Sequence, residues 1–390
     1  MKKEIIILGS TGSVGSSVLS VIKNNKNFKV RLLSSNNNVK KLYKQALIFK
    51  VKNVIIHNFD KYKKYKKKFR AEGITPHYKI SNINNIVKKK VDYSINSITG
   101  IEGLEPTLKI IPITKNILIA NKESIICGWG LIKKELKNSK TNFIPIDSEH
   151  FSIAELVGEK ESKNIQKIIL TASGGPFLTK SITKIKNAKP SQAIKHPNWN
   201  MGRKISIDSS TMMNKVFELI EAIKIFNINK NKISIIIHPT SYIHAIIFFK
   251  GGIIKLLAHD TSMKIPISNA IGIKNETNKN IIQQQLLKLN NLKFLKPDIK
   301  KFPLLKLIRL IPKQETLFET VLITMNDSLV EKYLNNQINY VSIQSNIINL
   351  IKKPYFKKFY KLKPKNIYDI KKTIKITKNY LNKNLKIYEN

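Results

Sequence analysis

The chain has 390 residues, of which 42% are hydrophobic, so it is long enough for two or three domains and can bury a substantial core. This composition excludes a disordered tail and a disulfide-rich miniprotein. The formal net charge of +45 would suit a nucleic-acid or membrane-surface partner, but nearly all of it is lysine, accompanied by abundant Ile and Asn. Because nucleic-acid binding favours arginine, we expect no nucleic-acid partner and attribute the charge to a coding bias toward A·T-rich codons.

The cysteine content and the lengths of the apolar runs indicate the cellular compartment of the protein. The single cysteine, Cys127, excludes an intramolecular disulfide and a Cys-based zinc site. The N-terminal apolar run Ile5–Leu8 is ended by Gly9, far short of a signal peptide, and no apolar run approaches the ~18 residues of a membrane span. We therefore expect a cytoplasmic protein with no membrane partner.

In chain order, the first hundred-odd residues alternate short apolar runs with amphipathic stretches. This alternation predicts βαβ units and a parallel sheet, which make a Rossmann-like α/β domain of residues 1–122. The runs expected to be strands are Ile5–Leu8, Val30–Leu33, Val54–Ile56 and Ile117–Ala120.

The amino-acid composition changes after the predicted sheet. Residues 123–273 are rich in Gly, Ser, Pro and His, and we expect a central α/β catalytic domain there. The polar stretch Lys274–Asn280 opens a predicted linker, 274–298, and residues 299–390 have the apolar spacing of a C-terminal helical bundle. The lysine-rich tail from Lys371 to Asn390 is expected to be a solvated end.

A glycine motif directly follows the first predicted strand. Gly9, Gly12 and Gly15 are spaced G-x-x-G-x-x-G and precede a helical pattern. In the first βα turn, this spacing favours a dinucleotide site, with the pyrophosphate at the helix N-terminus, over a plain glycine turn. After the second strand, the segment 36–38 is Asn-Asn-Asn and lacks the acid that would hold a free ribose 2′-hydroxyl, so an NADP-type cofactor fits better.

Three carboxylates stand out in a chain that has few. Asp147 and Glu149 lie two apart, so at the end of an extended strand both would point to one side. Glu218 lies on a predicted helix that begins at a Ser/Thr cap. Three oxygen donors, with no His pair of ligand spacing, suit a hard cation such as Mg²⁺ or Mn²⁺. Simple pairing with some of the many lysines explains these acids equally well, and their spacing does not decide between the two.

Candidate anion-binding groups occur in the same region. Ser173 lies in a Gly-containing loop, Ser209 is expected at a helix start, and Asn214 shares a helix face with Glu218 beside Lys215. These groups could hold a phosphate next to a metal, or could be an ordinary helix cap and surface turn.

The segment 196–202 places a tryptophan, Trp199, among turn-forming residues. Such a loop could close over a ligand as a lid and exclude water, or its indole could simply anchor the loop in the core.

Taken together, these segments resemble the 1-deoxy-D-xylulose 5-phosphate reductoisomerase family, NADPH-dependent enzymes of the non-mevalonate isoprenoid pathway. The resemblance implies NADPH- and metal-dependent rearrangement and reduction of a phosphosugar, 1-deoxy-D-xylulose 5-phosphate, to 2-C-methyl-D-erythritol 4-phosphate by a homodimer. The matching stretches keep the family order and separations, and they are Gly9–Gly15, Gly100–Thr107, Ala120–Ser124, Pro145–His150, Leu170–Phe177, His196–Ala222 and His238–His244.

The resemblance also implies roles for individual residues. NADPH would contact Thr11, Gly12, Ser13, Val14, Asn36, Asn37, Asn38, Asn121, Glu123 and Gly202. The metal would be held by Asp147, Glu149 and Glu218, which together with Lys122 form the catalytic group. The substrate would contact Lys122, Ser148, Glu149, Ser173, His196, Ser209, Asn214, Lys215 and Glu218, with its phosphate mainly on Ser173, Ser209, Asn214 and Lys215. The lid would lie around 195–203 and include Trp199 and Met201, and His244 matches a family histidine near the active site.

The chain departs from the family pattern in two places. Asn36-Asn37-Asn38 stands where Gly-Lys-Asn is common, so a basic residue expected near the 2′-phosphate is lost, although Lys40 and Lys41 lie close by. The segment 325–327, Met-Asn-Asp, replaces a more usual Ala-Asn-Glu, where we expect a local packing or capping change. Two other interpretations compete: another Rossmann-type NAD(P)-dependent oxidoreductase of a phosphorylated substrate, and a lysine-rich nucleic-acid-binding protein.

Overall fold

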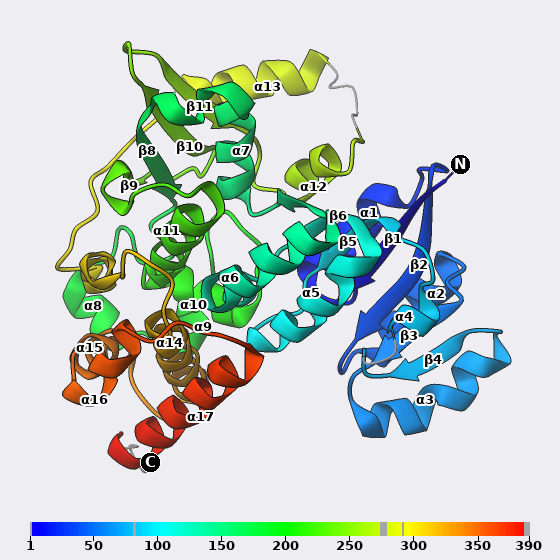
Figure 1. Ribbon diagram of the computed structural model, residues 1–390. Coiled ribbons are helices and arrows are strands. Elements are labelled where there is room, and N and C mark those ends of the chain that lie inside the picture. The colour runs from blue at the N-terminus through cyan, green and yellow to red at the C-terminus, as the bar shows by residue number, and fades with distance from the viewer. Residues whose placement is uncertain (1, 81–82, 274–278, 291, 386–390) are drawn as a thin grey trace. The chain divides into compact units, whose positions relative to one another are not determined.

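The computed structural model describes residues 2–80, 83–273, 279–290 and 292–385, which form two compact units (Figure 1). The first unit consists of Met1–Asp147 and Met263–Lys274, and the second of Ser148–Ser262 and Asn275–Asn390. Within the described ranges, no helix is long and apolar enough to cross a membrane. The finer division at residues 122, 273 and 298 stays a prediction.

The first unit is built on a seven-stranded parallel sheet with the order β4-β3-β2-β1-β5-β6-β7. The strand order reverses beside β1, so the carboxyl ends of β1 and β5 mark the switch point at which such sheets bind ligands. All four apolar runs predicted to be strands are confirmed, as β1, β2, β3 and β6. The strands are β1 Lys3–Leu8, β2 Phe28–Ser35, β3 Asn53–Ile56, β4 Thr75–Tyr78, β5 Val91–Asn96, β6 Thr114–Ile119 and β7 Asn142–Pro145.

Both faces of this sheet are buried. Ile5 and Ile7 of β1 pack in a cluster with Val18 and Leu19 of the first helix, while Leu8, which points to the other face, is also fully buried. Such double coverage is typical of parallel sheets. Helix α12 lies in sequence between the two segments of the second unit, yet it belongs to the first unit and packs on α1. The helices of this unit are α1 Ser13–Ile22, α2 Val39–Ile48, α3 Phe59–Ala71, α4 Ile83–Ile86, η1 Ile101–Gly103, α5 Leu104–Ile110, η2 Ile111–Ile113, α6 Lys122–Ser139 and α12 Lys264–Ala270.

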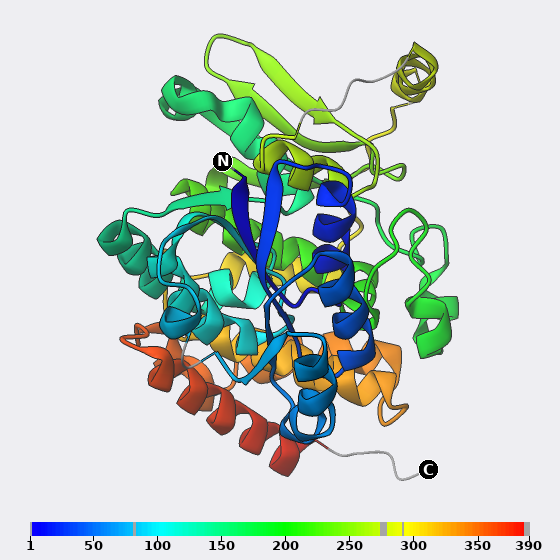
Figure 2. The ribbon, with the colours of Figure 1, turned by 90° about the vertical axis from the view of Figure 1, so that its right-hand side faces the viewer.

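The second unit contains a four-stranded mixed sheet with the order β11-β10-β8-β9. Strand β8 pairs in parallel with β9 and antiparallel with β10, and β10 forms a hairpin with β11. Helix α7 packs against this hairpin, as the two lie beside each other in Figure 2. The elements are α7 Ser148–Glu161, β8 Ile165–Ala172, β9 Ile233–Ile237, β10 Ile243–Phe249 and β11 Ile254–Ala258.

The remaining elements of the second unit are helical, which confirms the helical character predicted for the C-terminal region. Its last helix, α17 (red in Figure 1), packs on α14. The helices are η3 Ser162–Asn164, α8 Ile182–Lys186, α9 Pro190–Ala193, α10 Arg203–Ser210, α11 Met213–Phe226, η4 Lys230–Lys232, α13 Lys279–Leu289, η5 Pro303–Leu310, α14 Phe318–Leu334, α15 Tyr340–Ile351, α16 Pro354–Lys357, η6 Lys358–Tyr360 and α17 Ile367–Asn384.

The expectation of a solvated tail is confirmed for its described lysines, which are exposed, but the segment also forms helix α17, which has a buried face. Ile370, Thr373, Thr377 and Leu381 of α17 are buried, at the three- and four-residue spacing of a helix face. The lysines occupy the other positions, so a lysine-rich composition concealed an amphipathic helix. Residues 386–390 of this tail lie outside the described residues, as does most of the polar stretch 274–280.

The departure from the family pattern at residues 325–327 falls inside α14. The Asn326 side-chain amide donates to Asp208 Oδ1 at 2.7 Å, and Lys204 Nζ lies 3.1 Å from Asp208 and 2.9 Å from Asp327. These contacts join α14 to α10, so the altered segment continues the helix and packs against its neighbour.

Candidate active site

The glycine turn after β1 has the geometry that a dinucleotide site requires. Gly9 has φ +74°, and a β-carbon there would lie 2.7 Å from the Ser97 carbonyl oxygen. A β-carbon at Gly15 would lie 2.6 Å from the Gly9 carbonyl oxygen, so α1 approaches the turn closely only because this residue is glycine. Gly12 is the N-cap of α1 and supplies no side-chain cap, which leaves the first helical amides for an anion.

The asparagine segment after β2 has mostly structural contacts. Asn38 caps α2, because its Oδ1 accepts from the Lys41 backbone N–H at 3.2 Å. Asn37 Oδ1 accepts from the Asn58 side-chain amide at 3.2 Å, and Asn36 is exposed. A contact that sequence reasoning missed lies beside them, where Lys41 Nζ donates to the Thr11 carbonyl oxygen at 2.9 Å.

The other predicted cofactor residues lie at the starts of helices. Asn121 caps α6, and its amide donates to the carbonyl oxygens of Ile98 and Gly100, at 2.5 Å and 2.7 Å. Glu123, in the first turn of α6, is buried and accepts from the Asn121 amide at 3.1 Å. Thr11, Ser13, Val14, Asn36–Asn38 and Asn121 thus follow the carboxyl ends of β1, β2 and β6, at one edge of the sheet. Gly202 lies in the second unit, as the N-cap of α10.

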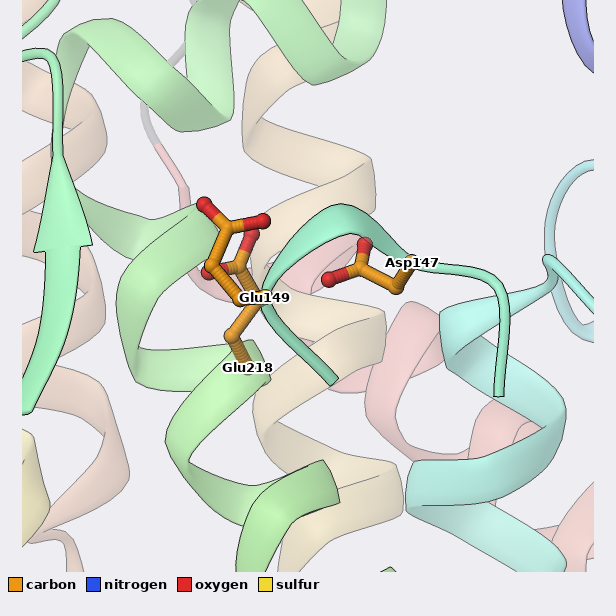
Figure 3. A group of neighbouring side chains, drawn as sticks. All are labelled: Asp147, Glu149 and Glu218. Atoms are coloured by element: carbon orange, nitrogen blue, oxygen red, sulfur yellow. The ribbon is translucent and has the colours of Figure 1, made fainter. Parts of the chain in front are cut away.

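The three carboxylates predicted to bind metal lie together (Figure 3). One potential ligand atom from each of Asp147, Glu149 and Glu218 lies within 4.8 Å of the others. Asp147 is in the turn between β7 and α7, and Glu149 is in the first turn of α7, so the predicted extended strand end is wrong. The predicted Ser/Thr cap is also wrong, because α11 begins after Met212 in a left-handed conformation (φ +62°). The cluster forms because a strand-to-helix turn, rather than strand alternation, brings the first two acids to the same place.

Two lysines neutralise part of this charge. Lys122 Nζ lies 2.5 Å from Asp147 Oδ2, and Lys215 Nζ contacts both Glu149 Oε1 and Glu218 Oε2. Lysine pairing and clustered carboxylates, which the sequence presented as alternatives, therefore coexist. Burial alone would lower the pKa of the Lys215 ammonium, but the carboxylates of Glu149 and Glu218 raise it above its ordinary value.

The donor set fits a hard divalent cation. Three carboxylates supply oxygen ligands only, and the two ammonium groups offset two of their three charges, so the cluster retains net negative charge. Ser148 Oγ donates to Glu149 Oε2 at 2.5 Å and fixes the orientation of that carboxylate. The Asn214 amide donates to Glu218 Oε1 in the same way.

The predicted phosphate residues Ser173 and Ser209 are brought together by a glycine. Gly175 has φ +66°, and a β-carbon there would lie 2.9 Å from the Ser210 Cα and 3.1 Å from the Ser209 carbonyl oxygen. Because Gly175 has no side chain, the loop that carries Ser173 can pack closely against the end of α10. Ser209 lies in the last turn of α10 rather than at a helix start, so the expectation that a helix N-terminus aids its anion binding is wrong.

His196 orients the Ser173 hydroxyl. His196 Nδ1 accepts backbone N–H bonds from Asn198 and Trp199, at 3.1 Å and 3.0 Å, so the ring proton is on Nε2 and is donated to Ser173 Oγ at 2.9 Å. Ser173 Oγ also accepts from the Gly175 N–H at 3.0 Å. With both bonds accepted, the Ser173 hydroxyl proton is available to an anion, since no acceptor for it lies among the described residues.

The His196 ring is neutral at physiological pH. Burial, together with the nearby positive charge of Lys215, lowers the pKa of His196 to about 4. Neutrality matters because only a neutral ring can accept on Nδ1 and donate on Nε2 at once. His196 therefore links the turn at Trp199 to the loop that carries Ser173.

The predicted lid residue Trp199 ends a row of rings. Its indole meets His244 edge-to-face at 6.0 Å, His244 stacks on His259 at 3.8 Å, and His259 meets Phe151 of α7 at 6.2 Å. Trp199 and Met201 are half-buried, so the indole has an anchor and also retains an accessible surface. Sequence reasoning missed His259, because only the β10–β11 pairing, with Ile243 opposite Ala258, places it beside His244.

Comparisons with known proteins identify the family to which the chain belongs. Three family models match: 1-deoxy-D-xylulose 5-phosphate reductoisomerase over residues 5–129, its C-terminal domain over 143–226, and DXP reductoisomerase C-terminal domain over 259–380. The 1-deoxy-D-xylulose 5-phosphate reductoisomerase of Pelagibacter ubique is 48% identical over 371 residues, covering 94% of this chain and 96% of its own length. The chain belongs to the 1-deoxy-D-xylulose 5-phosphate reductoisomerase family. A reductoisomerase from a Wolbachia of Drosophila simulans is 39% identical over 346 residues, covering 87% of this chain and 88% of its own length.

Solved reductoisomerase structures match nearly the whole chain. A DOX-P reductoisomerase in complex with NADPH, fosmidomycin and magnesium has a TM-score of 0.88 and 31% identity, covering 98% of this chain and 100% of its own. The reductoisomerase from Zymomonas mobilis in complex with NADPH has a TM-score of 0.84 and 28% identity, covering 99% and 100%. The family and the fold predicted from the sequence are therefore confirmed.

Proposed function

We propose that this chain catalyses the NADPH- and divalent-metal-dependent rearrangement and reduction of 1-deoxy-D-xylulose 5-phosphate to 2-C-methyl-D-erythritol 4-phosphate, in isoprenoid precursor biosynthesis. The observation that carries the proposal is the cluster of Asp147, Glu149 and Glu218 with Lys215 buried between two of them. Membership of the reductoisomerase family supports it, as do relatives of known structure that bind NADPH and magnesium.

The first unit binds NADPH in this proposal. Thr11, Gly12, Ser13 and Val14 would bind the pyrophosphate at the N-terminus of α1, where Gly12 leaves the helical amides without a side-chain cap. The remaining predicted contacts are Asn36, Asn37, Asn38, Asn121, Glu123 and Gly202.

Asp147, Glu149 and Glu218 would hold the Mg²⁺ or Mn²⁺ ion. When bound, this ion supplies Lewis-acid polarisation of substrate oxygens, which stabilises the negative charge that C–C cleavage creates. Lys122, which pairs with Asp147, would add a fixed positive charge beside the same oxygens. Ser148 would keep Glu149 in its ligating orientation through their hydrogen bond.

The substrate phosphate would be held by Ser173, Ser209, Asn214 and Lys215. The phosphate is remote from the bonds that change, so its binding energy can keep both carbon fragments in place during the rearrangement. His196 aims the Ser173 hydroxyl and, through its Nδ1, holds the backbone of the turn that carries Trp199. Phosphate binding and lid position would thereby be coupled, and a closed lid keeps water from the aldehyde.

The proposal is tested by following NADPH oxidation with 1-deoxy-D-xylulose 5-phosphate, with and without Mg²⁺ or Mn²⁺. We expect turnover only with the ion, and we expect Glu218→Gln to abolish turnover while NADPH binding persists. Glu155→Gln, on the exposed side of α7, is the control and should leave turnover unchanged. A metal-independent rate, or full activity in the Glu218 variant, would contradict the proposal and favour a simple Rossmann-type oxidoreductase.

Two further points belong to the proposal. Family membership supports a homodimer, which sedimentation equilibrium would test. A cytoplasmic location is supported by the highly charged, membrane-impermeant character of both the cofactor and the substrate, and fractionation of the source cells would test it.

A further inference from the structure

We propose that Lys41 supplies the positive charge that makes this chain prefer NADPH to NADH. The inference rests on the proposed function, which assigns a dinucleotide to the first unit, and adds the residue that reads its 2′-phosphate. The question arises because the segment after β2, Asn36-Asn37-Asn38, contains neither an acid for a ribose hydroxyl nor a base for a phosphate.

Lys41 is held against the glycine turn from the neighbouring helix. Its Nζ donates to the Thr11 carbonyl oxygen at 2.9 Å and to Ser16 Oγ at 2.7 Å, so a side chain of α2 crosses to the start of α1. An ammonium group has three donors, and these two bonds leave one of them for a ligand. The Lys41 side chain is therefore positioned before any ligand arrives.

The Lys41 charge has no acidic partner in the part of the chain that the structure describes. Both of its acceptors are neutral oxygens, and it lies beside the first turn of α1, where the helix dipole is also positive. The ammonium charge and the positive end of the helix dipole repel each other unless a bound anion offsets them. The arrangement therefore favours a ligand that carries more negative charge.

The end of β2 complements this arrangement. Ser35 is its last residue, and Ser35 Oγ and Thr11 Oγ1 share a hydrogen bond of 2.9 Å. Small neutral hydroxyls thus stand where an NAD-specific site would place a carboxylate. Whichever hydroxyl accepts in their shared bond keeps its own proton for a phosphate, which neither group repels. The Asn37 side chain accepts from the Asn58 amide and carries no charge. Lys41 is therefore the charged side chain that contacts the glycine turn here.

The chain offers a matched control in the preceding residue. Lys40 is exposed, and it makes no side-chain hydrogen bond or ion pair within the described ranges. Lys41→Ala and Lys40→Ala change the net charge equally, so a general electrostatic effect would appear in both. Lys41→Gln keeps a long polar side chain with an amide donor but has no charge, and it serves if the alanine variant does not fold.

The experiment measures equilibrium binding of NADPH and NADH to the full chain by nicotinamide fluorescence. From the strength of charge-assisted hydrogen bonds, we expect Lys41→Ala and Lys41→Gln to weaken NADPH binding about 10-fold to 100-fold, while NADH binding stays within about 2-fold. Lys40→Ala should leave both affinities near those of the wild type. The NADPH affinity should also fall less steeply with added salt in the Lys41 variants.

Three outcomes would overturn the inference. Equal loss of NADPH and NADH affinity in the Lys41 variants would mean that Lys41 only supports the glycine turn. Unchanged affinities for both cofactors would show that Lys41 does not contact the 2′-phosphate, and an equal loss of NADPH affinity in Lys40→Ala would show a non-specific charge effect. Failure of the wild-type chain to bind NADPH would instead refute the proposed function, so the two failures are distinguishable.

Discussion

Removing the buried ammonium of Lys215 should destabilise the protein in a pH-dependent way. In a Lys215→Met variant, Glu149 and Glu218 lose the cation between them, and their like charges would drive one of them to bind a proton. Holding a Glu of ordinary pKa 4.3 protonated at pH 7 costs about 1.4 kcal/mol per pH unit, or about 3.7 kcal/mol, which caps the loss. Because Met recovers part of the cost of burying a charge, we expect a loss of about 2–3.5 kcal/mol, below that cap.

The pH dependence gives the sharper test. The carboxylate pKa raised in the folded variant means that the folded state binds more protons than the unfolded state, so the variant gains relative stability as the pH falls. Urea unfolding at pH 7 and pH 5 should show the loss shrinking to about 1 kcal/mol at pH 5. Lys109→Met, which removes an exposed pair with Glu105, is the control and should cost less than about 1 kcal/mol at either pH. A loss for Lys215→Met that is below about 1 kcal/mol at pH 7, or equal at both pH values, would refute the reasoning.

Three further outcomes are expected. Gly175→Ala should cost about 1–3 kcal/mol more than Gly73→Ala by thermal unfolding, because both have nearly equal positive φ but only Gly175 would overlap Ser210; equal costs would remove the close approach from the account. Ser173→Ala should raise KM for the sugar phosphate about 10-fold with little change in kcat, and an unchanged KM would exclude its hydroxyl from phosphate binding. Burial and the neighbouring imidazole lower the pKa of His244 to about 4, so the unfolded state binds the extra proton and stability is lost as the pH falls from 6.5 toward 4. Between pH 7 and pH 5, the free energy of unfolding measured in urea should fall about 2 kcal/mol less in His244→Gln than in the wild type. An equal fall in both proteins would contradict a buried neutral ring.

Sequence periodicity predicted the parallel sheet of the first unit and four of its seven strands, β1, β2, β3 and β6. The runs at Ile5–Leu8 and Ile117–Ala120 are apolar on both faces, as parallel strands buried between helices require, and the glycines that follow β1 are imposed by close backbone contacts. In the C-terminal tail the apolar pattern is weaker, because lysines fill the exposed positions of α17 and two of its buried positions are threonines, Thr373 and Thr377.

The candidate site was predicted in composition but not in local geometry. The acids were named correctly as a cluster, yet residue spacing could not reveal that a strand-to-helix turn, rather than an extended strand, places Glu149 beside Asp147. Contacts that depend on tertiary pairing left no local signal, as with His259 behind His244 and Lys41 across the glycine turn. Such contacts follow from strand register and helix packing, which a short motif does not encode.

The identity of the product tests the central claim most directly, because only a reductoisomerase changes the carbon skeleton. Substrate labelled with ¹³C at the methyl-bearing ketone carbon would be incubated with the chain, NADPH and Mn²⁺, and the product examined by NMR. We predict a branched product in which the labelled carbon is quaternary, as in 2-C-methyl-D-erythritol 4-phosphate. A linear polyol phosphate, with the label in a reduced but unbranched CH–OH position, would contradict the account.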